Sequence, residues 1–531
     1  MKKQILSLLV LGAVAFSSCK KYLDVNKNPN TATTSSPELL LPQALTASAA
    51  NTVGLSDYGS WQVGYIANAG GYGGWGSTLT YNYTTSDYNG VWTNQYDALM
   101  DYQLIINYAK ADPKYTYYEA VARIMKAYTF QILVDNYGNV PYSQSLKGLD
   151  NIVPAYDNAE AIYKDIYNQL DTAIIKIRNA QEPQISLENS IGKADVMFGA
   201  TTDLTKWIKF ANTLKLKLLV RARKTTALDG VTKDFTGGFI DQDVLVNPNY
   251  SKNDGKQNPF WNNYHSNYAG TRAGAGNSRV PTRFIISFYN GTKLTDARGG
   301  VSFRNLTTAN QLGYTGDDAA TAPAGTAWYK GVSTAYTADE PDALGILKNR
   351  QQGQPIMFLA EAKFLQSEAA LFGVYAAGDP KVLFNEGILA SYRYLYSTWD
   401  GRFLSNKLPE TDYAAYFTNN ATGTYARLVN WDLATTNEQK LEAIITQKYI
   451  ALNFIMGHEA WAEYRRTGYP AITAGSTNAT ATFVSLNSTM TTPDKLPGRI
   501  LYPSSEYQVN PNNVPKGIAV TDYIFWDRRK N

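Results

Sequence analysis

The chain has 531 residues, enough for one large domain or two, and 44% of them are hydrophobic, as in a folded globular protein. Its 49 Lys and Arg residues nearly balance 45 Asp and Glu residues, so the formal net charge of +4 gives no electrostatic case for nucleic-acid binding. Aromatic residues are frequent, with 39 Tyr and 10 Trp. These flat rings with polar edges suit binding surfaces that are partly exposed to water, although the cores of large helical proteins also contain many Tyr residues.

The amino-terminal segment predicts export. Lys2 and Lys3 precede a short apolar run at residues 5–16, which is the order of a secretory signal peptide at residues 1–18. That run is shorter than the roughly 20 residues that a membrane-spanning helix needs, and no later segment is long and apolar enough to span. The signal predicts an exported protein that is not an integral helical membrane protein.

Small residues lead into Cys19, the only cysteine, at a position that resembles the bacterial lipobox. Phe16 stands where that motif usually has Leu, and an incidental cysteine in an ordinary signal peptide is the alternative. We expect Cys19 to be lipidated, because the only cysteine of the chain stands at this one position. Multiple acyl chains would then make the membrane anchoring stable. A single cysteine also leaves no internal disulfide. The polar composition of residues 19–36 predicts a lipidated tether, which is followed by a single domain at residues 37–531.

Hydrophobic residues at helical spacing predict five helices along the chain. The runs lie at residues 121–132, 162–177, 207–218, 358–372 and 441–456. Gly138 is expected to end the first helix, and Asp157 with Glu160 forms a capping-box pattern before the second. Thr436 and Gln439 form a similar pattern before the fifth.

Helical periodicity fades at residues 225–350 and from 467 to the end, where Gly, Thr, Asn and Pro dominate. These segments predict long loops with a few short strands, and loops of that length are usually functional. No internal repeat is legible in the sequence.

Several segments, taken in order, resemble the SusD/RagB family of surface lipoproteins from Bacteroidetes. They are CKKYLDVNKNP at 19–29, KAYTFQILVDNYGNVPYS at 126–143, TDLTKWIKFANTLKLKLLVRAR at 202–223, AEAKFLQSEAALF at 360–372, EAWAEYRRTGYP at 459–470 and RILYPSSEY at 499–507. The resemblance implies a mostly α fold with four tetratricopeptide-like helix pairs, long irregular loops and a few short strands. It also implies a lipid anchor in the outer membrane, exposure at the cell surface, and a SusC-like TonB-dependent transporter as partner in nutrient uptake.

Motifs for enzyme chemistry are weak in this sequence. It contains no His-Glu-x-x-His motif, no Gly-x-Ser-x-Gly elbow and no phosphate-binding loop. Of the two histidines, His265 and His458, the second is expected in the core or at an interface. Four helical acids, Glu361, Glu368, Glu459 and Glu463, are expected to cap helices or form ion pairs. No cofactor is predicted and no metal ligand is assigned. Whether a structural metal ion binds stays open, because acidic pairs such as Asp317-Asp318 are too generic.

An aromatic-rich segment at residues 58–92 is the first candidate ligand site. At its centre, Gly70–Gly76 reads GGYGGWG, where glycines flank each ring and predict a loop whose rings project outward. A sugar ring offers an apolar face for aromatic stacking and a rim of hydroxyls for polar side chains. The candidate residues are Tyr72, Trp75, Tyr81, Tyr83, Asn82 and Asp87. Trp61 and Trp92 are expected in the core, being nearest the helices.

A second cluster comprises Trp261, Tyr264, Tyr268 and Arg272, beside a Gly-rich stretch at 270–278, and a third comprises Trp328, Tyr329 and Tyr336. We expect the first two clusters to meet in an aromatic platform that binds an oligosaccharide or polysaccharide. The alternative is that these rings fill gaps between helices. Two other functions stay open: uptake of peptides, which some relatives of this kind bind, and a surface glycosidase, which needs only two well-placed carboxylates.

Overall fold

The computed structural model describes residues 35–530, except 181–189, 200–201, 324 and 332–339. The predicted signal peptide, Cys19, nearly all of the tether, and Tyr336 lie outside the described residues. Within the described part of the chain, no helix is both long enough and apolar enough to cross a membrane.

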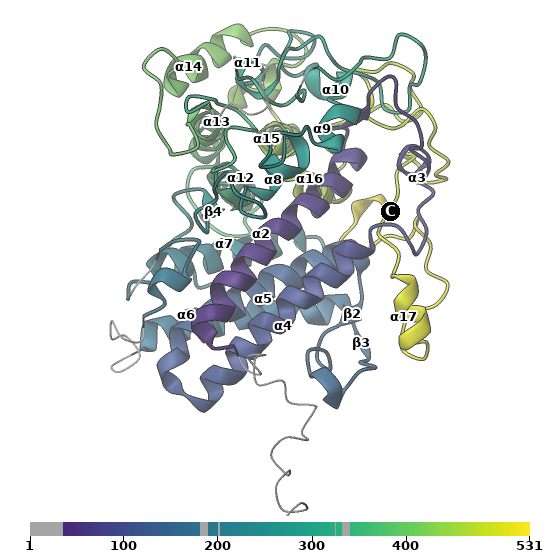
Figure 1. Cartoon of the computed structure of the whole chain (residues 1–531). Coiled ribbons are helices and arrows are strands. Elements are labelled where there is room, and N and C mark those ends of the chain that lie inside the picture. The colour runs from purple at the N-terminus through teal and green to yellow at the C-terminus, as the bar shows by residue number, and fades with distance from the viewer. Residues whose placement is uncertain (1–34, 181–189, 200–201, 324, 332–339, 531) are drawn as a thin grey trace, which may run out of the picture.

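Helices from the first half of the chain pack side by side, and in Figure 1 they fill the lower part of the molecule, from which α2 extends into the upper part. They are α2 (Pro37–Gln62), α4 (Asn89–Ala111), α5 (Thr116–Tyr137), α6 (Ala159–Asn179) and α7 (Thr205–Arg221). Successive helices contact each other: α4 packs on α2 and α5, and α6 packs on α5 and α7. A short turn at Pro113–Tyr115 reverses the chain between α4 and α5.

A second group of helices comes from the carboxyl-terminal half: α12 (Leu359–Leu371), α13 (Pro380–Tyr396), α14 (Pro409–Asn419), α15 (Asn437–Leu452) and α16 (Gly457–Thr467). Helix α12 contacts α7, and α16 packs against α2, so the two groups share contacts. A Cβ on Gly59 of α2 would lie 2.3 Å from the carbonyl carbon of Gly457. Glycine is therefore required where these two backbones meet.

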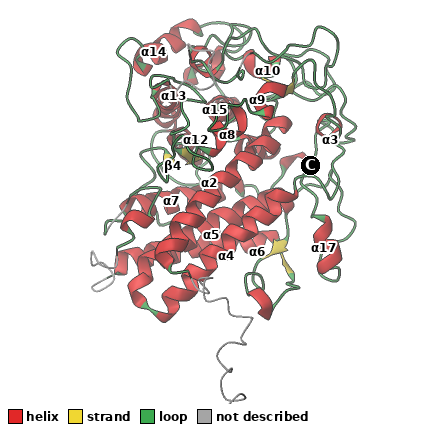
Figure 2. Ribbon diagram, in the orientation of Figure 1, coloured by secondary structure: helices red, strands yellow, loops and turns green. Residues whose placement is uncertain are grey.

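Among the described residues, three two-stranded antiparallel sheets complete the fold. Their short strands lie among the loops, which Figure 2 draws in green. They pair β1 (Ala67–Asn68) with β5 (Arg279–Val280), β2 (Val140–Pro141) with β3 (Tyr156–Asp157), and β4 (Val244–Val246) with β6 (Gln354–Met357). Short helices lie in the connections: α3 (Ser77–Thr80), α8 (Pro259–Tyr264), α9 (Gly274–Ser278), α10 (Arg283–Ile286), α11 (Arg298–Ser302) and α17 (Ser504–Val509). The predicted mostly α fold with long loops and a few short strands is confirmed.

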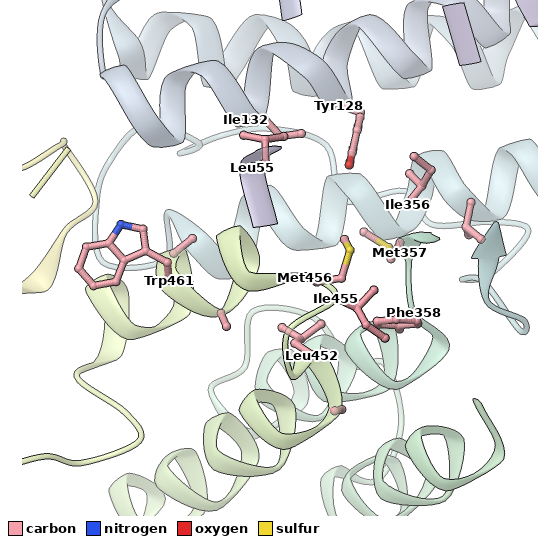
Figure 3. Close-up of a cluster of buried hydrophobic side chains, with 14 of the residues drawn as sticks. Leu55, Tyr128, Ile132, Ile356, Met357, Phe358, Leu452, Ile455, Met456 and Trp461 are labelled. Carbon is pink, nitrogen blue, oxygen red and sulfur yellow. The ribbon is translucent and has the colours of Figure 1, made fainter. Parts of the chain in front are cut away.

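The core joins both helix groups. Figure 3 shows Leu55 of α2 and Ile132 of α5 above Trp461 of α16. Beside them lie the side chains of Ile356, Met357, Phe358, Leu452, Ile455 and Met456. All of these side chains are buried. Burial on this scale supplies the main driving force for folding, because each large apolar side chain contributes roughly 1.5–3 kcal/mol when removed from water.

The five predicted helices are present as α5, α6, α7, α12 and α15, and the capping box of Thr436 with Gln439 opens α15 as expected. The predicted capping of α6 was wrong. Asn158, not Asp157, accepts hydrogen bonds from the first amides of that helix. Asp157 accepts hydrogen bonds from the amides of Tyr142 and Ser143, which directly follow β2.

Candidate functional site

The pairing of β1 with β5 brings the two predicted aromatic clusters together, although they lie about 200 residues apart in the sequence. Asn68 lies opposite Arg279 in this sheet, and the amide of Ala69 donates to the carbonyl of Ser278 at 2.9 Å. Side-chain bonds fix the strand, because Asn310 Nδ2 donates to the carbonyl of Asn68 at 2.8 Å. The loop at residues 69–76 therefore adjoins the loop at 267–278. We call these two segments the loop face.

Beneath the loop face, an ion pair links the clusters. Asp57 of α2 pairs with Arg279 of β5 and accepts a hydrogen bond from the hydroxyl of Tyr264 at 2.8 Å. The Arg279 guanidinium lies 5.3 Å from the ring of Trp61 and 5.8 Å from that of Tyr264. Burial, then the negative charge of Asp57, raises the pKa of Tyr264 well above its usual range, so its hydroxyl stays a donor. These residues form a charged and aromatic layer under the surface.

Two rings of the first loop reach the surface. Tyr72 is 48% exposed, and Trp75 is half-buried with its ring 5.5 Å from that of Trp61. The indole of Trp75 donates to the carbonyl of Tyr72 at 3.2 Å, which holds the loop closed on itself. Gly71 and Gly74 have φ of 79° and 78°, a conformation that favours glycine. The predicted outward projection of a ring from this loop is confirmed for Tyr72.

The two polar candidates of this segment, Asn82 and Asp87, differ in how exposed they are to solvent. Asn82 is exposed. Asp87 is half-buried, and its carboxylate accepts from the hydroxyl of Ser77 at 2.9 Å and from the amide and hydroxyl of Thr84 at 2.7 and 2.9 Å. Asp87 therefore stabilises the loop before α4, and Asn82 is the more accessible polar group.

Four predicted ligand-binding rings lie in the core, and the prediction of direct ligand contact is corrected for them. They are Tyr81, Tyr83, Trp261 and Tyr264, each at most 5% exposed. The Tyr81 hydroxyl accepts from the amide of Ser485, and the Tyr83 hydroxyl from Gln62. Trp261 stacks on His265 with ring centroids 3.9 Å apart. Local composition does not distinguish such rings from exposed ones, because their burial depends on segments distant in the sequence.

Tyr268 and Arg272 are the remaining candidates of the second cluster. Tyr268 is 44% exposed at the tip of a turn closed by the bridge between Ser266 and Arg272. Arg272 is half-buried and donates to the carbonyl of Pro323 at 3.1 Å. The accessible candidates of the loop face are thus Tyr72, Trp75, Tyr268 and Arg272, and Asn82 is exposed outside it, just after α3.

Sequence reasoning did not single out Asp57 or Arg279, and it counted Tyr88 in the aromatic segment at 58–92 without making it a ligand-binding candidate. Tyr88 lies 4.7 Å from Tyr58 and 5.3 Å from Tyr83 between ring centroids, and its backbone is left-handed, with φ of 57°. The only sequence signal for these three residues was their position near aromatic segments. The third aromatic group does not join the surface where it is described, since Trp328 and Tyr329 are buried. Trp61 and Trp92 are buried as expected.

The four helical acids considered for catalysis form buried ion pairs, as predicted. Glu459 pairs with Lys217 at 2.6 Å and with Arg221 at 2.7 Å, while Glu368 pairs with Arg466 at 2.6 Å. The same network includes Glu361 and Glu463. His458 is buried beside it, as expected. Among residues that the structure describes, no group of three or more His, Cys, Asp or Glu side chains could hold a metal ion.

The fold and this surface define a helical scaffold that carries irregular, aromatic loops. A profile of the SusD-like family, described as Susd and RagB outer membrane lipoprotein, matches residues 53–522. The chain belongs to this family, which confirms the resemblance seen in the sequence. No curated protein matches the chain significantly.

Solved structures show the same fold at low sequence identity. A SusD homologue from Bacteroides fragilis is 20% identical, with a TM-score of 0.65 over 93% of this chain and 99% of its own. A SusD-like protein from Bacteroides thetaiotaomicron is 20% identical, with a TM-score of 0.61 over 92% and 98%. A chitin-binding SusD homologue from Flavobacterium johnsoniae is 21% identical, with a TM-score of 0.62 over 92% and 98%.

Proposed function

We propose that this protein captures an oligosaccharide at the cell surface and delivers it to a SusC-like TonB-dependent transporter. The observation that carries the proposal is the β1–β5 pairing, which joins two aromatic loops into the loop face. Binding sites commonly lie on loops that a rigid scaffold positions. Tyr72 and Trp75 offer rings for the apolar face of a sugar, and Asn82 and Arg272 offer polar groups for its hydroxyls.

Membrane attachment through Cys19 belongs to the same proposal. The family is one of outer membrane lipoproteins, and Cys19 follows the predicted signal peptide directly. Mass spectrometry of the mature amino terminus should find a diacylglyceryl group on Cys19. A Cys19→Ser protein that still fractionates with the outer membrane would contradict this anchor.

Isothermal titration with chito-, malto- and xylo-oligosaccharides and with a peptide library tests the cargo. We expect one glycan series to bind and Tyr72→Ala to weaken that binding about tenfold, since an aromatic contact contributes up to about 1.5 kcal/mol. Tyr425→Ala is the matched control, because Tyr425 is 36% exposed and lies outside the loop face. Selective peptide binding would favour the peptide-uptake alternative, and sustained release of shorter sugars would favour a glycosidase.

A further inference from the structure

A cavity lies outside the loop face, between α4, α5, α6 and the connection from β2 to β3. Its volume is about 600 Å³, within the range of small-molecule sites. In Figure 1 these helices occupy the lower half of the molecule, while α3 and α9 beside the loop face are in the upper half. The cavity is therefore spatially separate from the loop face.

Lys126 of α5 is the central cation of this cavity. Its Nζ donates to Gln103 Oε1 of α4 at 2.7 Å, and Gln103 Nε2 donates to Asn107 Oδ1 at 2.9 Å. In the described part of the chain, no carboxylate lies within 4.0 Å of this ammonium group, and the same holds for Lys110 and Lys147, which also line the cavity. These amides orient a cation that has no ion-pair partner.

The acids around the cavity do not balance its cations. Lys110, Arg123, Lys126 and Lys147 line it with only two acids, Asp150 and Asp165. Asp165 accepts from the hydroxyl of Tyr142 and from Gln169 at 3.4 Å, and Arg123 is already paired with Glu119 at 2.7 Å. Burial, helped by the charges of Arg123 and Lys110 and opposed by that of Asp165, lowers the pKa of Lys126 to about 8. A bound anion would supply the charge that this ammonium group lacks.

The rest of the lining is amphipathic. Apolar side chains line it together with amides and hydroxyls, and the apolar ones include Met100, Leu104, Ile106, Leu146 and Ile166. A sugar acid combines what such a lining can bind: a carboxylate, several hydroxyls and an apolar C–H face. We propose that this cavity binds a hexuronic acid unit of an oligosaccharide, with Lys126 facing the carboxylate and Gln103, Asn107 and Gln169 facing the hydroxyls. The proposal rests on the proposed function only for the carbohydrate nature of the cargo.

Isothermal titration of the full mature protein with trigalacturonate tests this site. We expect Lys126→Gln to weaken binding about tenfold or more, because a hydrogen bond to a charged group is lost. Lys164→Gln removes the same charge from an exposed position on α6 outside the cavity and should leave binding unchanged. The fully methylated ester of the ligand should bind as weakly to the normal protein as trigalacturonate binds to Lys126→Gln.

The pH dependence gives a second readout. Because Lys126 in the free protein loses its proton above pH 8, binding of trigalacturonate should weaken about tenfold between pH 7 and pH 9. Lys126→Arg should keep the binding and lose most of that pH dependence. Asp165, Arg123 and Lys110, which shift the pKa of Lys126, are unchanged in this comparison, as are Lys147 and Asp150, which also line the cavity.

Several results would overturn the proposal. They are no binding of trigalacturonate, equal binding of the ester, unchanged binding by Lys126→Gln, or equally strong competition by acetate, phosphate or a Glu-Glu dipeptide. The outcome is distinguishable from that of the proposed function, because Tyr72→Ala alters only the loop face and Lys126→Gln alters only this cavity.

Discussion

At the scale of single residues, the loop face depends on one ion pair under its surface. Asp57 and Arg279 are 222 residues apart, and their side chains are 20% and 17% exposed. The same carboxylate accepts from Tyr264, and the same guanidinium lies beside Trp61, which supports Trp75. Through these contacts, the ion pair fixes the surface rings relative to helix α2.

Asp57→Asn should lower the free energy of unfolding by about 2 kcal/mol, because it leaves the Arg279 guanidinium largely buried without a counter-charge. Urea denaturation measures this loss. Asp400→Asn is the control: Asp400 pairs with Arg402 at 2.8 Å on the surface, where an ion pair contributes at most about 1 kcal/mol. Equal effects of the two substitutions would show that the Asp57 pair does not hold the loop face together.

At the scale of elements, the loop at residues 69–76 depends on backbone conformation more than on packing. A Cβ at Gly73 or at Gly74 would meet no atom within 4 Å, but only Gly74 has a left-handed backbone. These neighbouring glycines thus separate the two effects.

Gly74→Ala should destabilise the loop conformation by about 1 kcal/mol, because a side chain disfavours φ of 78°. Glycan binding to the loop face should weaken about fivefold in the same variant, as titration would show. Gly73→Ala should bind normally. If both variants bind equally well, the conformation of this loop does not matter for the cargo.

The sequence predicted the helices that have a clear apolar stripe, such as α6, and the caps that local side chains form, such as Thr436 with Gln439. It did not predict α2, because that helix is rich in Ala, Ser, Thr and Gly and is buried on several sides. At the candidate site, composition identified the loops that contain Tyr72 and Tyr268. Which neighbouring rings are buried follows from the β1–β5 pairing, a long-range contact that periodicity does not reveal.

At the scale of the whole molecule, the two histidines make stability depend on pH. Burial lowers the pKa of His265 to about 3 and that of His458 to about 4; nearby arginines add to the first shift, and Glu459 opposes the second. Unfolded histidine takes up a proton near pH 6.5. Their contribution to stability is therefore complete above pH 6.5 and is lost as the pH falls toward 4.

When the pH falls from 7 to 5, each histidine is protonated in the unfolded state but not in the folded state. Each should therefore lower the free energy of unfolding by about 2 kcal/mol over this range. His458→Gln should reduce the total drop by that amount, as urea denaturation at both pH values would show. Asp243, whose pKa burial raises to about 6, acts in the opposite direction and is present in both proteins. An unchanged drop in His458→Gln would mean that this residue is protonated in the folded state.

Hydrogen exchange of backbone amides tests cargo binding at the loop face most directly. The measurement compares the free protein with the protein saturated by the glycan that titration identifies. We expect slower exchange in peptides covering residues 69–76 and 267–278. Saturating glycan that leaves both segments unprotected, or protects only segments elsewhere, would contradict it.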